Sequence, residues 1–101
     1  MNSVAERRIV LVREGQEDSV ITIRIGIPYE VDAFQWSCPV ALDGLYERLV
    51  DLSGVDSFQA LMLAQSVLRT LLKAVVEEGG RLVSLGERAD IDIDVLFDKG
   101  I

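Results

Sequence analysis

Three aspartates that alternate with β-branched residues form the most unusual local pattern in this chain of 101 residues. Asp90, Asp92 and Asp94 have the Asp-x-Asp-x-Asp spacing with which a calcium-binding loop begins. Such a loop needs glycine at its sixth position and glutamate at its twelfth, and this chain has Val95 and Ile101 there. We therefore predict no metal site from this pattern.

The same alternation, over residues 90–97, predicts a β-strand that carries its carboxylates on one face. One interpretation is a charged edge strand, whose solvated acids prevent pairing with other chains. The other is a recognition surface for a basic partner, because a dense negative field steers association and selects partners. In that second interpretation the acidic partner-binding residues are Asp90, Asp92, Asp94, Glu87 and Asp98.

The residue types needed for catalysis are missing from the chain. It contains no histidine, which excludes a Ser-His-Asp triad, a Cys-His dyad and a histidine-ligated metal. A pair of catalytic carboxylates needs one buried acid with a raised pKa, and no acid lies inside an apolar run. The single cysteine, Cys38, is expected to be a small buried residue. We predict no catalytic residue and no cofactor, and expect that the protein is not an enzyme.

Composition predicts one small acidic domain that spans residues 1–101. Lys and Arg number 10 against 17 Asp and Glu, which gives a net charge of −7, and half of the residues are apolar. A negative chain is a poor match for phosphate backbones and anionic lipid, so nucleic-acid and membrane-surface partners are disfavoured. The N-terminal residues lack the apolar region of a secretory signal, and no apolar run is long enough to predict a membrane span. We expect a cytoplasmic protein.

Alternating strands and one helix must position these residues. Residues 9–13 and 20–27 predict a hairpin, with Ile21, Ile23 and Ile25 on one face. Further strands are predicted at residues 34–42, 46–52 and 81–85, with the acidic strand last. Together they predict an α+β fold: an antiparallel sheet of four to six strands, a β-meander, packed on one long helix in the order β-β-β-β-α-β(-β).

The predicted helix runs from about residue 56 to residue 78. Asp56 and Gln59 have the spacing of a capping box, and Gly79 and Gly80 follow as a C-terminal stop. The apolar residues of this helix cover more of its circumference than one sheet contact requires. Either the C-terminal segment and loops cover the excess, or it contacts a second protein or a second copy. The second interpretation makes Phe58 and Met62 partner-binding residues.

The chain also resembles a family of small bacterial proteins known only as a domain of unknown function. The resemblance rests on Trp36-x-Cys38-Pro39 and on the run from Gly54 to Ala64, with the motif G-x-D-S-x-Q-A-L-x-L-A. It extends from about residue 8 to residue 85 and carries no catalytic residues with it. Short genes of this kind are often found in toxin–immunity cassettes, so the resemblance implies a binding role.

These observations favour a small non-enzymatic protein-binding domain of the immunity or antitoxin type. Such a protein would bind and occlude a toxin, and the basic substrate cleft of a nuclease toxin would suit an acidic surface. A self-associating structural or adaptor domain, a homodimer through the helix face, is the first alternative. A small-molecule-binding domain, with a cleft near Trp36, Tyr46 and Arg48, is the second.

Overall fold

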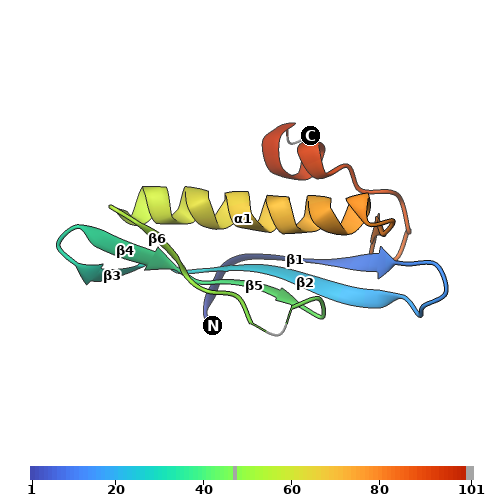
Figure 1. Cartoon of the computed structure of the whole chain (residues 1–101), viewed down its shortest axis with the longest axis horizontal. Coiled ribbons are helices and arrows are strands. Elements are labelled where there is room, and N and C mark those ends of the chain that lie inside the picture. The colour runs from blue at the N-terminus through green and yellow to red at the C-terminus, as the bar shows by residue number, and fades with distance from the viewer. Residues whose placement is uncertain (47, 100–101) are drawn as a thin grey trace.

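The computed structural model describes residues 1–46 and 48–99 and has the predicted α+β fold (Figure 1). Seven strands and one long helix follow each other along the chain, and a short π-helical turn comes last. Their bounds are β1 Ser3–Val12, β2 Ser19–Gly26, β3 Tyr29–Asp32, β4 Gln35–Cys38, β5 Val40–Asp43, β6 Leu52–Gly54, α1 Ser57–Glu77, β7 Arg81–Ser84 and the turn Val95–Lys99. All strand pairs are antiparallel.

The strands form two sheets, with the orders β5-β2-β1-β7 and β3-β4-β6. The division falls at Pro28 and Pro39, because proline has no N–H to give to a β-ladder. At this bend the Gly26 N–H donates to the Pro39 carbonyl at 2.8 Å, and a Cβ on Gly26 would lie 2.8 Å from the Pro39 Cβ. The strand predicted over residues 34–42 is therefore two strands, β4 and β5, which belong to different sheets.

The strand predicted over residues 46–52 was wrong except at its last residue. A tight turn follows β5, in which the N–H groups of Leu45 and Tyr46 both donate to the Leu42 carbonyl at 3.0 Å. The described residues 48–51 form no regular element, and β6 begins only at Leu52 and pairs with β4. Residues 29–32, for which no strand is predicted, form β3.

One face of α1 packs on the sheets and builds the core. Its fully enclosed side chains are Ala60, Ala64, Leu68 and Leu72, and they meet Ile9, Leu11, Ile21 and Leu42 from the sheet. By length and composition alone α1 could also cross a membrane, but a helix that buries one face against a sheet passes the same test. The role of α1 in this fold is that of a core helix.

The predicted N-cap of α1 is confirmed, the reciprocal bond of Gln59 goes to the residue before the cap, and Gly79, with φ 104°, follows the helix as the predicted stop. The Asp56 carboxylate accepts from the Gln59 N–H at 2.8 Å, and the Gln59 side chain accepts from the Val55 N–H at 2.8 Å. Asp56→Ala should therefore lower the free energy of unfolding by about 1 kcal/mol, the usual contribution of an N-cap. Urea unfolding measures it, with Ser57→Ala as the neighbouring control. Equal losses in the two variants would contradict this assignment of the cap.

The acidic strand predicted over residues 90–97 is the main error of the sequence analysis. Asp90 forms a single β-bridge with Val83, and the chain turns helical from Ile93. The Asp92 carboxylate accepts from the N–H groups of Asp94 and Val95, at 2.8 and 3.3 Å, and so begins this helical turn. Alternation over so few residues is ambiguous, because a local side-chain cap can satisfy the backbone in place of a ladder.

Candidate functional site

The five acids predicted as one partner-binding face do not lie on one face. Asp94 and Asp98 both contact Arg69 of α1, at 2.7 and 2.6 Å, and Asp94 also contacts Lys73 at 3.1 Å. Asp90 pairs with Arg81 at 2.8 Å, and Asp92 caps the C-terminal turn. Glu87 is exposed in the turn after β7. Most of this negative charge is therefore balanced inside the chain.

Those ion pairs hold the C-terminal turn alongside α1 (Figure 1). The Gln65 side chain adds a hydrogen bond to the Phe97 carbonyl at 3.3 Å. Ile93 is buried in the core, and Leu96 and Phe97 pack against it. The C-terminal segment thus covers part of the flank of α1.

The Asp94 carboxyl gives these contacts a pH dependence. Hydrogen bonds from Lys73 and Arg69 hold its pKa below the ordinary value of 3.8. A lowered pKa in the folded state means that this stabilisation is complete above the ordinary pKa and is lost as the pH falls below it. Between pH 5 and pH 2 the free energy of unfolding of Asp94→Asn should therefore fall less than that of wild type. The urea midpoint at each pH measures this. Glu14→Gln, an exposed acid in the β1–β2 turn, is the control, and parallel curves for wild type and Asp94→Asn would refute the expectation.

Phe58 and Met62, the two predicted partner-binding residues of the helix, lie one turn apart on α1. Their exposed fractions are 71% and 40%. Met62 borders a hollow that it shares with Gln65, Arg69 and Phe97, next to the C-terminal turn. The structure therefore brings Met62 and Asp98 to the same hollow and leaves Phe58 exposed.

The geometry does not support the second alternative, a small-molecule cleft near Trp36, Tyr46 and Arg48. Trp36 is partly buried and packs against the core, whereas Tyr46 and Arg48 are exposed. None of the three lines the cleft described next. Cys38 is fully buried, as predicted, and burial raises the pKa of its thiol.

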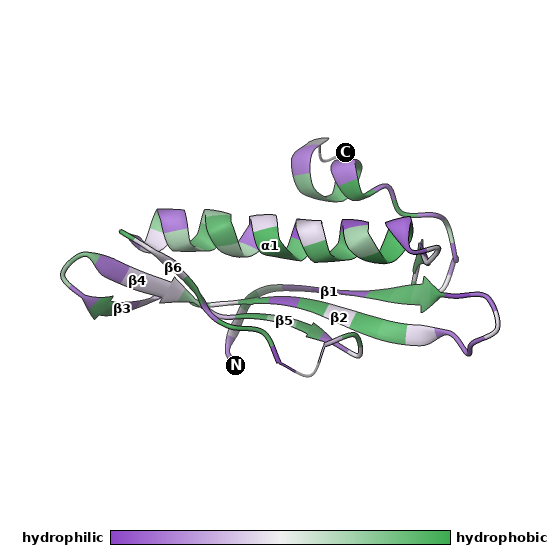
Figure 2. Ribbon diagram, viewed as in Figure 1, coloured by the Kyte–Doolittle hydropathy of each residue, from purple (hydrophilic) through white to green (hydrophobic). Residues whose placement is uncertain are grey.

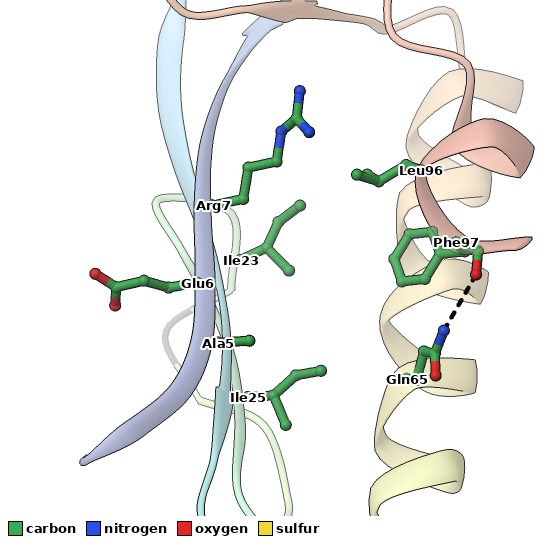
Figure 3. Close-up of a pocket in the computed structure, with 8 residues that line it drawn as sticks. All are labelled: Ala5, Glu6, Arg7, Ile23, Ile25, Gln65, Leu96 and Phe97. Atoms are coloured by element: carbon green, nitrogen blue, oxygen red, sulfur yellow. Dashed lines mark hydrogen bonds between the residues drawn. The ribbon is translucent and has the colours of Figure 1, made fainter. Parts of the chain in front are cut away.

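An apolar cleft opens between the sheet and α1 beside the C-terminal turn. We call it the edge cleft; it is lined by Ala5, Arg7, Ile23, Ile25, Gln65, Leu96 and Phe97. Figure 3 shows Ala5, Ile23 and Ile25 pointing toward the helix, and Glu6, which also borders the cleft, pointing away. Its volume is about 230 Å³, below the roughly 300–1,000 Å³ of pockets that bury small ligands.

The cleft exists because β7 is much shorter than β1. β7 pairs only with Ile9–Val12, and within residues 1–46 and 48–99 no strand pairs with Ser3–Arg8 on the side away from β2. Figure 2 shows that β1 is apolar where β7 covers it and hydrophilic just before that point, at Glu6–Arg8. An unpaired strand edge exposes backbone N–H and C=O groups that can pair with another chain.

Two further hollows adjoin the cleft. One, of about 470 Å³, is lined by Arg7, Ser84, Glu87, Asp92 and Leu96, and together with the edge cleft it forms what we call the edge groove. The other, also of about 470 Å³, is lined by Met1–Glu6 and Arg24. It lies on the opposite face of the sheet, because Glu6 points away from the helix and pairs with Arg24.

The charges at the groove are of both signs. Arg7 and Arg8 lie on the unpaired part of β1 and make no ion pair within the described residues. Arg24, on β2, is held by Asp43 at 3.2 Å and Glu6 at 3.4 Å. Glu87 and Asp92 lie beyond the end of β7. The middle of the groove is thus locally positive and one end is negative.

The described residues contain no group of acids or cysteine that could hold a metal ion. The groove also lacks a buried titratable side chain, since Arg7 and Glu87 are exposed. Its apolar floor and unpaired backbone are suited to binding a polypeptide.

Sequence reasoning missed the groove residues Ala5, Arg7, Gln65, Leu96 and Phe97. One signal was available. β1 extends back through the charged residues before Ile9, so the five-residue strand predicted at 81–85 is too short to cover all of it. No such signal indicated that the C-terminal turn borders the groove, because acidic and apolar residues alternate in residues 90–97 as they do in a strand.

Comparison with known families gives one result. A family model described as a domain of unknown function, DUF6968, matches residues 5–95. The match includes β1 from Ala5 onward, all of β2 to β7 and α1, and the start of the C-terminal turn. No curated protein and no solved structure matches the chain.

Proposed function

This chain belongs to the family of the domain of unknown function DUF6968, and we propose that it is a protein-binding domain without catalytic activity. The observation that carries this proposal is the edge groove, where an apolar cleft lies directly beside an unpaired strand edge. Exposed apolar surface next to unpaired backbone is typical of protein–protein contact sites.

The narrower form of this proposal is an immunity or antitoxin role in a bacterium. Support comes from the small size, the net charge of −7 and the resemblance to small bacterial proteins. The acidic C-terminal segment offers a partner less unpaired negative charge than its composition indicates, because Asp90, Asp94 and Asp98 are paired within the chain. A toxin would in this case be recognised through the groove, with the remaining negative charge steering a basic partner toward the domain.

Site-specific photocross-linking in the producing cell tests the proposal. Ala5, which lines the cleft, is replaced by p-benzoylphenylalanine, and so in a matched control is Val50, which is 86% exposed outside the groove. We expect a covalent adduct with a protein at position 5 and none at position 50. No adduct at position 5, or equal adducts at both positions, would contradict the proposal.

Self-association through α1 is the second candidate function, and the observation that favours it is the exposure of Phe58, 71%, next to Met62. Sedimentation at high protein concentration tests it. A dimer that Phe58→Glu converts to monomer would support the homodimer, and a wild-type monomer would exclude it.

A further inference from the structure

We propose that the edge groove binds an extended segment of a partner protein as an additional β-strand against β1. The segment carries an acidic residue opposite Arg7 and an apolar residue opposite Ala5. This inference rests on the proposed function and deepens it, since it names the conformation and the chemistry of the bound segment.

The shape of the groove favours an extended segment. Three hollows adjoin the uncovered part of β1. The two of the edge groove share Arg7 and Leu96, and the third, on the opposite face of the sheet, shares Ala5 and Glu6 with the edge cleft. The side chains of a paired strand alternate between the two faces. The uncovered part of β1, Ser3–Arg8, is roughly 20 Å long at about 3.3 Å per residue. A compact ligand would fill one hollow, whereas a strand would contact all three and pair with the backbone along its length.

The direction of the added strand follows from β7. β7 runs antiparallel to β1 and ends opposite Ile9. The chain then turns away at Gly86, whose φ of 92° is a left-handed conformation that glycine adopts without strain. A partner strand that continues the line of β7 would therefore be antiparallel to β1, and its first residues would lie opposite Arg8 and Arg7.

The side chains along the edge define the sequence of that strand. Residues directly opposite each other in an antiparallel pair share one face. A residue opposite Ala5 would thus point into the cleft toward Ile25 and Phe97 and should be apolar. A residue opposite Arg7 should be acidic, because this arginine makes no ion pair in the described part of the chain.

At the end of the groove next to Ser84 the charge is reversed. Glu87 and Asp92 line this end, so a basic residue is expected at the start of the partner strand. A second copy of β1 does not offer this pattern. Antiparallel pairing centred on Glu6 places Ala5 opposite Arg7, and pairing centred on Arg7 places a second arginine there, so neither register supplies the acidic residue.

A synthetic peptide tests the proposal on the intact protein. The probe is acetylated Lys-Thr-Glu-Thr-Val-Thr-Val, which places glutamate opposite Arg7 and the first valine opposite Ala5. Pairing with β1 begins at the threonine opposite Arg8, because Ile9 already pairs with Ser84, and the lysine extends past this point toward Glu87 and Asp92. The control peptide exchanges the lysine and the glutamate, so its composition is identical. Binding is followed by NMR titration and by amide hydrogen exchange, with wild type and Arg7→Glu, a substitution of an exposed side chain that should leave the fold intact.

We expect the probe to slow amide exchange within Ser3–Arg8 and to shift the resonances of Leu96 and Phe97. The control peptide should bind roughly fivefold more weakly, as expected for partly exposed charge pairs, and Arg7→Glu should abolish this preference. The proposal is overturned if neither peptide binds, if both bind wild type equally, or if protection appears elsewhere. It is also overturned if these amides are already protected without peptide and lose protection on dilution, because a second copy then occupies the edge.

This experiment and the photocross-linking experiment fail separately. An adduct at position 5 without peptide binding would retain the protein-binding function and refute strand addition. Peptide binding at β1 without an adduct in the cell would support the strand-accepting edge and refute the proposed cellular function.

Discussion

Leu68→Ala should lower the free energy of unfolding by about 2–5 kcal/mol, the cost of removing a buried leucine side chain and leaving a cavity. Leu68 is at the middle of α1 and is 0% exposed. It packs in the same core cluster as Ile9, Leu11 and Ile21 of the sheet. Since domains of this size are stable by only about 5–15 kcal/mol, we expect this variant to lose much of its stability.

Urea unfolding monitored by circular dichroism measures the effect. Val50→Ala is the matched control, because Val50 is also aliphatic but is 86% exposed, and its loss should stay within roughly 0.5 kcal/mol. A small loss for Leu68→Ala, similar to that of the control, would contradict the packing of α1 on the sheet.

Gly54→Ala should be among the most damaging changes of a single methyl group. A Cβ on Gly54 would lie 2.5 Å from the backbone N of Ala60, because the first turn of α1 packs directly on β6. The obstructing atom belongs to the helix backbone and cannot rotate away as a side chain can. We expect a loss at or above the upper end of the roughly 1–3 kcal/mol that overpacking costs, since either β6 or the start of α1 must shift.

Ser53→Ala is the control for this prediction, because Ser53 is the exposed neighbour on the same strand. Unfolding free energies of both variants and exchange rates of the amides in the first turn of α1 are the measurements. Gly54→Ala should accelerate exchange there, and Ser53→Ala should not. Unchanged stability of Gly54→Ala would mean that β6 and α1 are farther apart than the structure places them.

Gly54 also gives a physical reason for one part of the sequence motif. In Gly54-x-Asp56 the glycine allows the close approach of strand and helix, and Asp56 caps the helix that approaches. Both residues therefore act in the same joint between β6 and α1. The function of the domain does not follow from this motif, which has a structural role.

The sequence by itself determined the secondary structure wherever a local pattern had one stable solution. The alternation of Ile21, Ile23 and Ile25 was sufficient for β2, and Asp56 with Gln59 was sufficient for the start of α1. The α+β fold class follows from these elements, because a one-sided strand and a one-sided helix must cover each other. The burial of Cys38 was also predictable, since an apolar strand position allows a small thiol.

Only the tertiary structure decided the candidate site. Local signals in residues 90–97 allow both a strand and a turn capped by Asp92. The turn is held in place by Arg69 and Lys73, which are far away in the sequence and attract Asp94 and Asp98. The division of the strands into two sheets was likewise a matter of long-range pairing around Pro28 and Pro39. The edge groove results from both, because a strand edge is open only when no other segment of the chain reaches it, and this is a property of the whole fold.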